Sequence, residues 1–283
     1  NWYYNGGVLI NHTLTGLAPM MLDFAIDLAY RAGALIRAGA ERDVSYEPKQ
    51  HADVVTEVDR ASEALIVGAI RARYPDHAII AEEGSGVSMS SPYTWLIDPL
   101  DGTLNFLHGL PIFAVSIALL AYNEPLLGVV YDPMRNELFY AERGHGAFLN
   151  GRRLRVSQTS TLARSLLSSG LPYDRFEQPD NNLAELTHLA MLVQDIRRPG
   201  SAALDLCAVA AGRTDGHWEL GLKPWDVAAG GLIALEAGAT VTDWHGEAWR
   251  PLASDRLVAT NGLIHAELLA ALAAARRNRH TTV

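Results

Sequence analysis

The residues best suited to chemistry lie at positions 98–103, where the sequence reads Asp-Pro-Leu-Asp-Gly-Thr. They follow the apolar run 94–97, so two carboxylates, a turn set by Pro99 and a Gly-Thr pair come together where an expected strand ends. Carboxylate oxygens are ligands that Mg²⁺ prefers, and Gly102 with Thr103 can offer backbone N–H groups and a hydroxyl to a phosphate. Read alone, the stretch is also an ordinary surface turn. The prediction of a cation and phosphate site therefore depends on other acidic positions.

Three other carboxylates stand where helices or strands are expected to begin or end. Glu82 follows a short apolar run, Asp59 lies in the first turn of an expected helix, and Asp226 lies where a loop enters an apolar helix. Simpler interpretations exist, since Asp59 would complement a helix dipole and Asp226 would serve as an N-cap. Together with Asp98 and Asp101, however, these carboxylates exceed what capping requires.

These side chains need elements that position them, and hydrophobic periodicity predicts helices over 21–39 and 57–73. Residues 56–59 form a capping-box pattern at the start of the second helix. Between 111 and 156 the sequence reads as extended runs joined by turns, including the Asn150-Gly151 pair typical of a hairpin. We therefore expect an antiparallel meander in this part of the chain.

Beyond residue 157, helical and extended patterns alternate, which is typical of α/β layers. Helices are expected over 181–193, 201–211, 225–236 and 263–277, and short strands near 166, 196, 215–220, 240–243 and 257–259. The predicted organisation is an N-terminal extension of no assigned function (1–19), an α+β half with the metal and phosphate site (20–156) and an α/β substrate half (157–283).

Composition excludes several classes of protein. The 283 residues are 49% apolar, and 23 basic against 32 acidic residues give a formal net charge of -9, so a broad nucleic-acid surface is not expected. No apolar run reaches the roughly 18 residues that cross a membrane. The single cysteine, Cys207, excludes an intrachain disulfide, and its apolar neighbours favour a buried thiol in a reducing compartment. None of the ten histidines has the spacing of a metal site. We expect a cytoplasmic protein.

Five motifs, in matching order and separation, make the chain similar to the inositol monophosphatase family of Mg²⁺-dependent, lithium-sensitive phosphatases, from about Met21 to Ala275. The motifs are Asp-Val-Val-Thr-Glu-Val-Asp at 53–59, Glu82-Glu83, Trp-Leu-Ile-Asp-Pro-Leu-Asp-Gly-Thr-Leu-Asn-Phe at 95–106, Gly-Ser-Ala-Ala at 200–203 and Trp-Asp-Val-Ala-Ala-Gly at 225–230. With the element pattern, the resemblance implies a mixed α+β fold, a layered α-β-α-β-α sandwich with an antiparallel N-terminal sheet and an alternating α/β C-terminal half. It also implies a phosphoric monoester hydrolase, often a homodimer.

By this resemblance, carboxylates and one carbonyl hold two Mg²⁺ ions. The first would be bound by Glu82, Asp98 and the Leu100 carbonyl. The second would be bound by Asp98, Asp101 and Asp226, so that Asp98 bridges the pair. A third, weaker cation near Glu82 belongs to the same picture. Paired cations can stabilise the attacking and leaving oxygens of a phosphoryl transfer and activate a water molecule.

The resemblance also implies roles around that water and the substrate. Thr103 and Asp59 would orient and deprotonate the water, and Glu82 counts with them among the catalytic residues. The Gly102 and Thr103 amides would hold the phosphate. The groups expected to contact a polyol are the backbone of Gly200, Ser201 and Ala202 and the carboxylates of Glu219, Asp101 and Asp226.

The most specific expectation is therefore hydrolysis of inositol monophosphate by metal-activated water. Leu104-Asn105-Phe106 favours this branch over 3′-phosphoadenosine and histidinol-phosphate phosphatases, which typically differ there. Fructose-1,6-bisphosphate stays open as a substrate, because relatives of dual specificity share these motifs. A haloacid-dehalogenase phosphatase is disfavoured, since it needs aspartates two residues apart and Asp98 and Asp101 are three apart. An alternative of another class is a module that binds RNA or a transcription complex.

Overall fold

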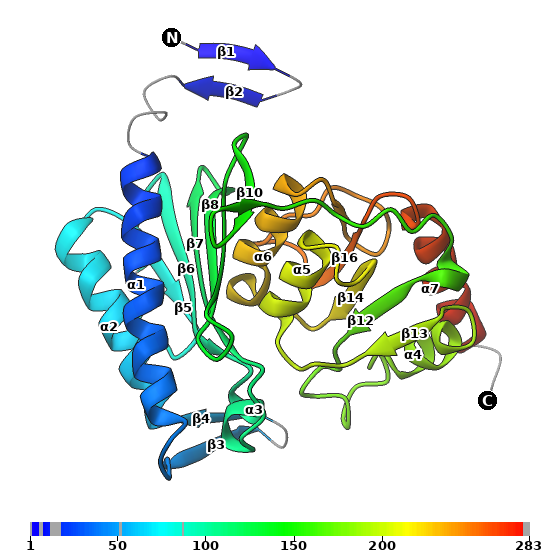
Figure 1. The fold of residues 1–283 in the computed structure, drawn as a ribbon, viewed down its shortest axis with the longest axis horizontal. Helices are drawn as coiled ribbons and strands as arrows, with labels where there is room; N and C mark the ends of the chain where they lie inside the picture. The colour runs from blue at the N-terminus through cyan, green and yellow to red at the C-terminus, as the bar shows by residue number, and fades with distance from the viewer. Residues whose placement is uncertain (1, 6–7, 12–17, 51–52, 87, 280–283) are drawn as a thin grey trace.

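Five layers make up the fold: helices, a sheet, helices, a second sheet and helices (Figure 1). The computed structural model describes residues 2–5, 8–11, 18–50, 53–86 and 88–279. In layer order, the helices are α1 (Ala18–Gly39) and α2 (Glu57–Arg73), then α5 (Ala202–Ala210) and α6 (Pro224–Glu236), then α4 (Leu183–Ala190) and α7 (His265–Arg279). The predicted layered α-β-α-β-α sandwich is confirmed.

The seven-stranded sheet has the order β11-β10-β9-β8-β7-β6-β5. Its strands are β5 (Ala78–Ala81), β6 (Tyr93–Asp101), β7 (Ala114–Ala121), β8 (Glu124–Asp132), β9 (Glu137–Glu142), β10 (Gly146–Leu149) and β11 (Arg152–Arg153). The meander expected over 111–156 is antiparallel throughout, although its last strand is only two residues long.

One pair departs from the predicted antiparallel sheet, because β5 runs parallel to β6, with Ala81 beside Ile97. The connection between them is long enough to return the chain to the same end of the sheet, which a parallel pair requires. Parallel strands end at the same edge. The residues that follow Ala81 and Ile97, Glu82 and Asp98, therefore come together there.

The five-stranded sheet has the order β13-β12-β14-β16-β15. Its strands are β12 (Leu166–Ser169), β13 (Asp195–Arg197), β14 (Gly216–Leu220), β15 (Thr240–Thr242) and β16 (Arg256–Thr260). β12 pairs in parallel with both β13 and β14, whereas β16 is antiparallel to β14 and β15. The alternation of helices and strands expected beyond residue 157 is confirmed.

Smaller elements complete the chain. β1 (Trp2–Asn5) pairs with β2 (Val8–Asn11), and these strands belong to the predicted extension 1–19, of which residues 1, 6–7 and 12–17 lie outside the described residues. A hairpin of β3 (Tyr46–Gln50) and β4 (Asp53–Thr56) leads into α2, and a short helix α3 (Thr103–Leu107), not expected from periodicity, follows β6. A 3₁₀ turn (Leu162–Arg164) precedes β12. None of the described helices combines the length and hydropathy needed to cross a lipid bilayer.

The middle helical layer joins the two sheets. Helix α6 packs on β7, β8 and β9 of the larger sheet, although it comes from the second half of the chain. Its residues Ala228, Ala229 and Ile233 are fully buried. Gly128 of β8 lies so close to α6 that a Cβ at this position would be 2.8 Å from the Ala229 Cα atom. The predicted halves 20–156 and 157–283 therefore share one buried layer.

Candidate active site

The end of β6 carries the motif that the sequence singled out. The Asp98 side chain is buried, and its Oδ1 atom accepts a hydrogen bond from the Leu100 N–H at 3.0 Å. Pairing with β7 shifts register between Asp98 and Asp101. Gly102 follows with a φ of 96°, and a Cβ there would lie 2.9 Å from the Ile112 carbonyl oxygen. A left-handed conformation at such close approach suits glycine alone.

Asp101 connects this turn to the start of α5. Its Oδ2 atom accepts hydrogen bonds from the Ser201 hydroxyl at 2.5 Å and from the Ala203 N–H at 2.8 Å. Ser201 is also the N-cap of α5, so one hydroxyl group both caps the helix and positions a carboxylate. The Asn105 side chain ties the two segments together by donating to the Pro199 carbonyl at 2.8 Å.

Asp226 lies in the first turn of α6, but it is not the N-cap. That position is held by Lys223, and Pro224 is the first residue of the helix. The Asp226 Oδ2 atom accepts a hydrogen bond from the Lys223 N–H at 2.7 Å. The simpler interpretation of Asp226 as an N-cap is therefore wrong by three positions, because the proline and the backbone contact move the helix start upstream.

Asp59 lies behind the site and holds Thr103. Its Oδ1 atom accepts a hydrogen bond from the Thr103 hydroxyl at 2.7 Å, and that hydroxyl also lies 3.0 Å from the Leu100 carbonyl oxygen. The other carboxylate oxygen accepts from the backbone and hydroxyl of Thr56, which confirms the capping box. Burial raises the pKa of Asp59, although the bonds from Thr56 and Thr103 oppose this. Asp59 thus bridges the α2 start and the α3 start.

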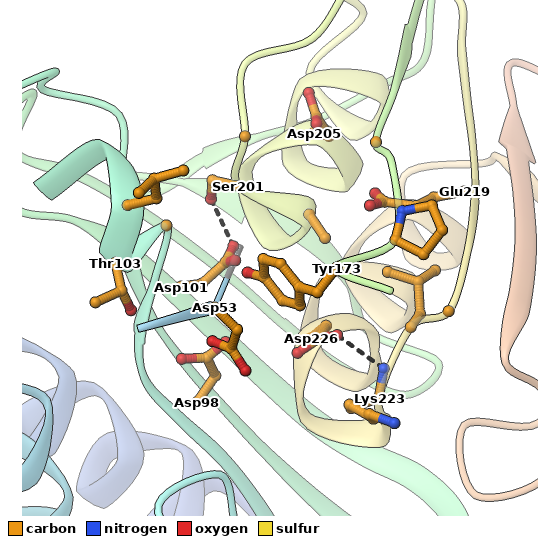
Figure 2. Close-up of a pocket in the computed structure, with 18 of the residues that line it drawn as sticks. Asp53, Asp98, Asp101, Thr103, Tyr173, Ser201, Asp205, Glu219, Lys223 and Asp226 are labelled. Atoms are coloured by element: carbon orange, nitrogen blue, oxygen red, sulfur yellow. Dashed lines mark hydrogen bonds between the residues drawn. The ribbon is translucent and has the colours of Figure 1, made fainter. Parts of the chain in front are cut away.

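A cavity of about 310 Å³ lies where the ends of β6 and β14 meet the starts of α5 and α6 (Figure 2). The predicted site residues that line it are Glu82, Asp98, Leu100, Asp101, Gly102, Thr103, Gly200, Ser201, Ala202, Glu219 and Asp226. Asp59 does not line the cavity, since its side chain is fully buried and reaches it only through Thr103. The fold therefore brings eleven of the twelve predicted positions to one cavity.

The carboxylates of the cavity disfavour one another's charge. Burial, and after it the neighbouring carboxylates, raises the pKa of Asp98 well above its usual range. Burial likewise raises the pKa of Asp226, and it raises that of Asp101 to about 6 in spite of the hydrogen bonds from Ser201 and Ala203. A divalent cation would offset this accumulation of negative charge.

The donor set fits a hard cation, although its atoms do not converge on one point. Glu82, Asp98, Asp101 and Asp226 offer carboxylate oxygens, which Mg²⁺ prefers. Across the described parts of the chain, no three His, Cys, Asp or Glu side chains are gathered closely enough to hold a metal ion as they stand. One oxygen of Asp101 and one of Asp226 accept hydrogen bonds from protein donors, Ser201 and Lys223.

Among the cavity residues that were not predicted as site residues, Lys49 and Tyr173 carry polar groups into it. Lys49 Nζ lies 3.1 Å from Glu82 Oε1 and 2.5 Å from Glu83 Oε1, so it neutralises part of the acidic edge. Burial would lower the pKa of Lys49, but the two carboxylates raise it. The sequence signal that could have identified Lys49 was its position shortly before the motif that begins at Asp53. Tyr173, whose ring Figure 2 shows beside Asp101, comes from a loop that carries no such signal.

The chain is similar to known proteins over most of its length. The sequence profile of the Inositol monophosphatase family matches residues 19–280. An inositol-1-monophosphatase of Synechocystis is 48% identical over 255 residues, covering 89% of this chain and 88% of that protein. A Nus factor SuhB of Pasteurella multocida is also 48% identical, over 88% of this chain and 94% of its own length. The structure of an inositol monophosphatase from Anabaena superposes with a TM-score of 0.82 at 46% identity, covering 91% of this chain and 96% of that one.

Proposed function

Because the chain belongs to the inositol monophosphatase family, we propose that it hydrolyses phosphate monoesters, with inositol monophosphate as the preferred substrate. The observation that carries this proposal is that one cavity is lined by the carboxylates proposed as metal ligands, the Gly102 turn and the Thr103 hydroxyl. The 48% identity to an inositol-1-monophosphatase supports the substrate. Fructose-1,6-bisphosphate and other small sugar or nucleotide phosphates are the alternatives.

Members of the family depend on a metal, and we propose Mg²⁺, with two ions and a weaker third. Glu82, Asp98 and the Leu100 carbonyl would hold one ion, and Asp98, Asp101 and Asp226 the other. Bound Mg²⁺ supplies positive charge that polarises the phosphoryl oxygens and lowers the pKa of a coordinated water.

The chain's own residues would prepare the attacking water. The Thr103 hydroxyl would accept a proton from the attacking water and pass its own proton to Asp59, to which it donates a 2.7 Å hydrogen bond. Because burial raises the pKa of Asp59, its carboxylate is a stronger base than an exposed one. The Gly102 and Thr103 amides would bind the phosphate, and Glu219 with the Gly200–Ala202 backbone would bind hydroxyl groups.

A phosphate-release panel tests the function. The purified protein with Mg²⁺ would be given inositol monophosphate, fructose-1,6-bisphosphate, 3′-phosphoadenosine-5′-phosphate and histidinol phosphate. We expect the highest kcat/KM for inositol monophosphate, loss of turnover in excess chelator, and inhibition by Li⁺, as is typical of the family. Equal turnover with and without chelator would contradict the role of the metal, and a higher kcat/KM for another substrate would reassign the specificity.

The noncatalytic alternative, a module that binds RNA or a transcription complex, has one observation in its favour, because a relative of 48% identity is named a Nus factor. Catalysis has the stronger support, since a protein with only a binding role would not need the proposed metal-ligand carboxylates, and all of them are present. Co-purification from cells with a macromolecular partner, unchanged by Asp98→Asn, would establish the second role independently of the first.

The proposal includes a homodimer in the cytoplasm. The free and fully buried thiol of Cys207 suits a reducing compartment. Light scattering of the purified protein would give twice the 30.7 kDa chain mass for a dimer.

A further inference from the structure

A fully buried histidine lies next to the part of the cavity assigned to hydroxyl groups. His217 and Glu219 are two residues apart on β14, so their side chains point to the same face of the sheet. The His217 ring is 0% exposed. Glu219 and Asp205, which both line the cavity, lie at one end of it in Figure 2, while Asp98 lies at the other.

Three polar groups surround this ring. Its Nδ1 atom lies 3.0 Å from the Ser168 hydroxyl of β12 and 3.9 Å from Asp205 Oδ2 of α5. Its Nε2 atom lies 3.3 Å from Glu219 Oε2, an ion-pair distance, and forms no hydrogen bond within the described residues. A buried nitrogen without a hydrogen bond is costly, and the ion-pair contact with Glu219 is what offsets that cost here.

The Glu219 carboxylate is confined from the other side as well. A Cβ added to Gly170, just beyond β12, would lie 1.7 Å from Glu219 Oε1. The carboxylate therefore occupies the space that a side chain at this position would need. Glu219 itself remains 15% exposed, so it can reach a ligand in the cavity while its position is restricted by Gly170 and His217.

We infer that His217 is a positioning residue that holds the Glu219 carboxylate toward the hydroxyl groups of the substrate and so sets the preference for polyol monophosphates. The inference rests on the proposed function. Burial alone would lower the pKa of the His217 imidazole, but Glu219 and Asp205 outweigh it and raise the pKa, which favours a protonated ring beside the carboxylate. The family's usual site residues, as carried over from the motifs, do not include this position.

The test compares two substrates, inositol monophosphate and p-nitrophenyl phosphate, which has no hydroxyl groups on its leaving group. His217→Asn keeps a polar group near Nδ1 but withdraws the one near Nε2, and we expect it to lower the ratio of kcat/KM values for the two substrates about tenfold. His217→Gln, whose amide reaches the Nε2 position, should restore most of the ratio. In a Glu219→Gln background, His217→Asn should change the ratio no further.

A control separates positioning from general stability. His265 is another buried histidine, with its two ring nitrogens 3.0 Å from the Thr260 and Thr242 hydroxyls, and it does not line the cavity. His265→Asn should lower the melting temperature and leave the ratio unchanged. An unchanged ratio in His217→Asn, or an equal loss in the Glu219→Gln background, would overturn the inference.

Two further outcomes keep the test decisive. If His217→Asn does not fold, the pKa of His217 is measured instead from its imidazole ¹⁵N chemical shifts in the wild type and in Glu219→Gln. The pKa should fall when the carboxylate becomes an amide, and an unchanged pKa would overturn the contact between the two side chains. Absence of phosphate release from inositol monophosphate by the wild type would instead overturn the proposed function, and the inference with it.

Discussion

The Thr103 hydroxyl stands between a buried carboxylate and the cavity, and its removal isolates the proposed proton path. Thr103→Ala leaves the carboxylates in place, so Mg²⁺ affinity should be kept while kcat falls by about 10²–10⁴, the usual contribution of positioned proton transfer. Thr103→Ser keeps the hydroxyl that Asp59 accepts from at 2.7 Å and should retain most of the activity. Steady-state kinetics beside calorimetric titration of Mg²⁺ would detect the difference. Loss of metal binding in Thr103→Ala would refute the assignment.

Substitution of a cavity carboxylate should, unlike Thr103→Ala, weaken the binding of Mg²⁺. In Asp98→Asn or Asp226→Asn a neutral amide replaces a ligand that a hard dication prefers, so the Kd for Mg²⁺ should rise at least about tenfold. Burial and, after it, the neighbouring carboxylates raise the pKa of Asp98, so removing one charge relieves part of this repulsion and the apoprotein should not be less stable for it. Calorimetric titration measures the Kd, and an unchanged value would mean that the residue is not a ligand.

Sequence reasoning identified the acidic positions because carboxylates at strand ends and helix starts are unusual in such number. It did not identify His217 or Tyr173, and the reason is physical. A histidine in an alternating strand has the same pattern whether it fills a core or restrains a neighbour. Only the 3.3 Å approach of its ring to Glu219 distinguishes the two, together with the Ser168 hydroxyl that the pairing of β12 with β14 places 3.0 Å from the Nδ1 atom.

At the scale of elements, the contact between β8 and α6 leaves no room for a side chain. Gly128→Ala would place a Cβ 2.8 Å from the Ala229 backbone, which cannot move without shifting the helix. We expect a loss of about 1–3 kcal/mol in the free energy of unfolding, as is usual for overpacking. Gly68→Ala is the matched control, since nothing lies within 4 Å and the position is exposed in α2, so it should stabilise by about 0.5–1 kcal/mol. Urea denaturation measures both, and equal effects would contradict the packing argument.

The reactivity of a cysteine in helix α5 provides a second measure of how tightly the middle helical layer is packed. Cys207 is fully buried in it, and burial raises the pKa of the thiol well above its ordinary value. The thiolate fraction is therefore lower than in an exposed cysteine, and the native protein at pH 8 should not react with a thiol reagent. Because the chain has one cysteine, one equivalent should react in urea. Rapid labelling of the native protein would mean that the layer opens.

The elements themselves were largely predictable. The helix expected over 57–73 matches α2 to the residue, because the capping box marks its start. The short helix α3 was missed, since five residues carry too little periodicity. The parallel pairing of β5 with β6 was also missed, and no local signal records which neighbour a strand will have. That pairing is what brings Glu82 to Asp98.

At the scale of the whole molecule, ligands to the proposed metals come from both parts of the layered fold. Asp98 and Asp101 belong to β6 of the larger sheet, and Asp226 belongs to α6 of the middle layer. Mg²⁺ that binds only the folded chain should therefore stabilise it, by about 2.7 kcal/mol at a free concentration one hundred times Kd. The melting temperature with and without Mg²⁺ tests this, with Asp98→Asn expected to show a smaller shift. An equal shift in both proteins would indicate binding elsewhere.

The shared middle layer also has a consequence for how such a chain can evolve. Helix α6 is encoded in the second half of the gene but fits against β7, β8 and β9, which are encoded in the first. Recombination near the codon for residue 156 would join the Gly128 surface to a helix selected against a different strand, which would disturb the packing and, with it, the position of Asp226. We therefore expect the two halves to be inherited as one unit, and a change of substrate to be reached more easily through the loops around the cavity than by exchange of halves.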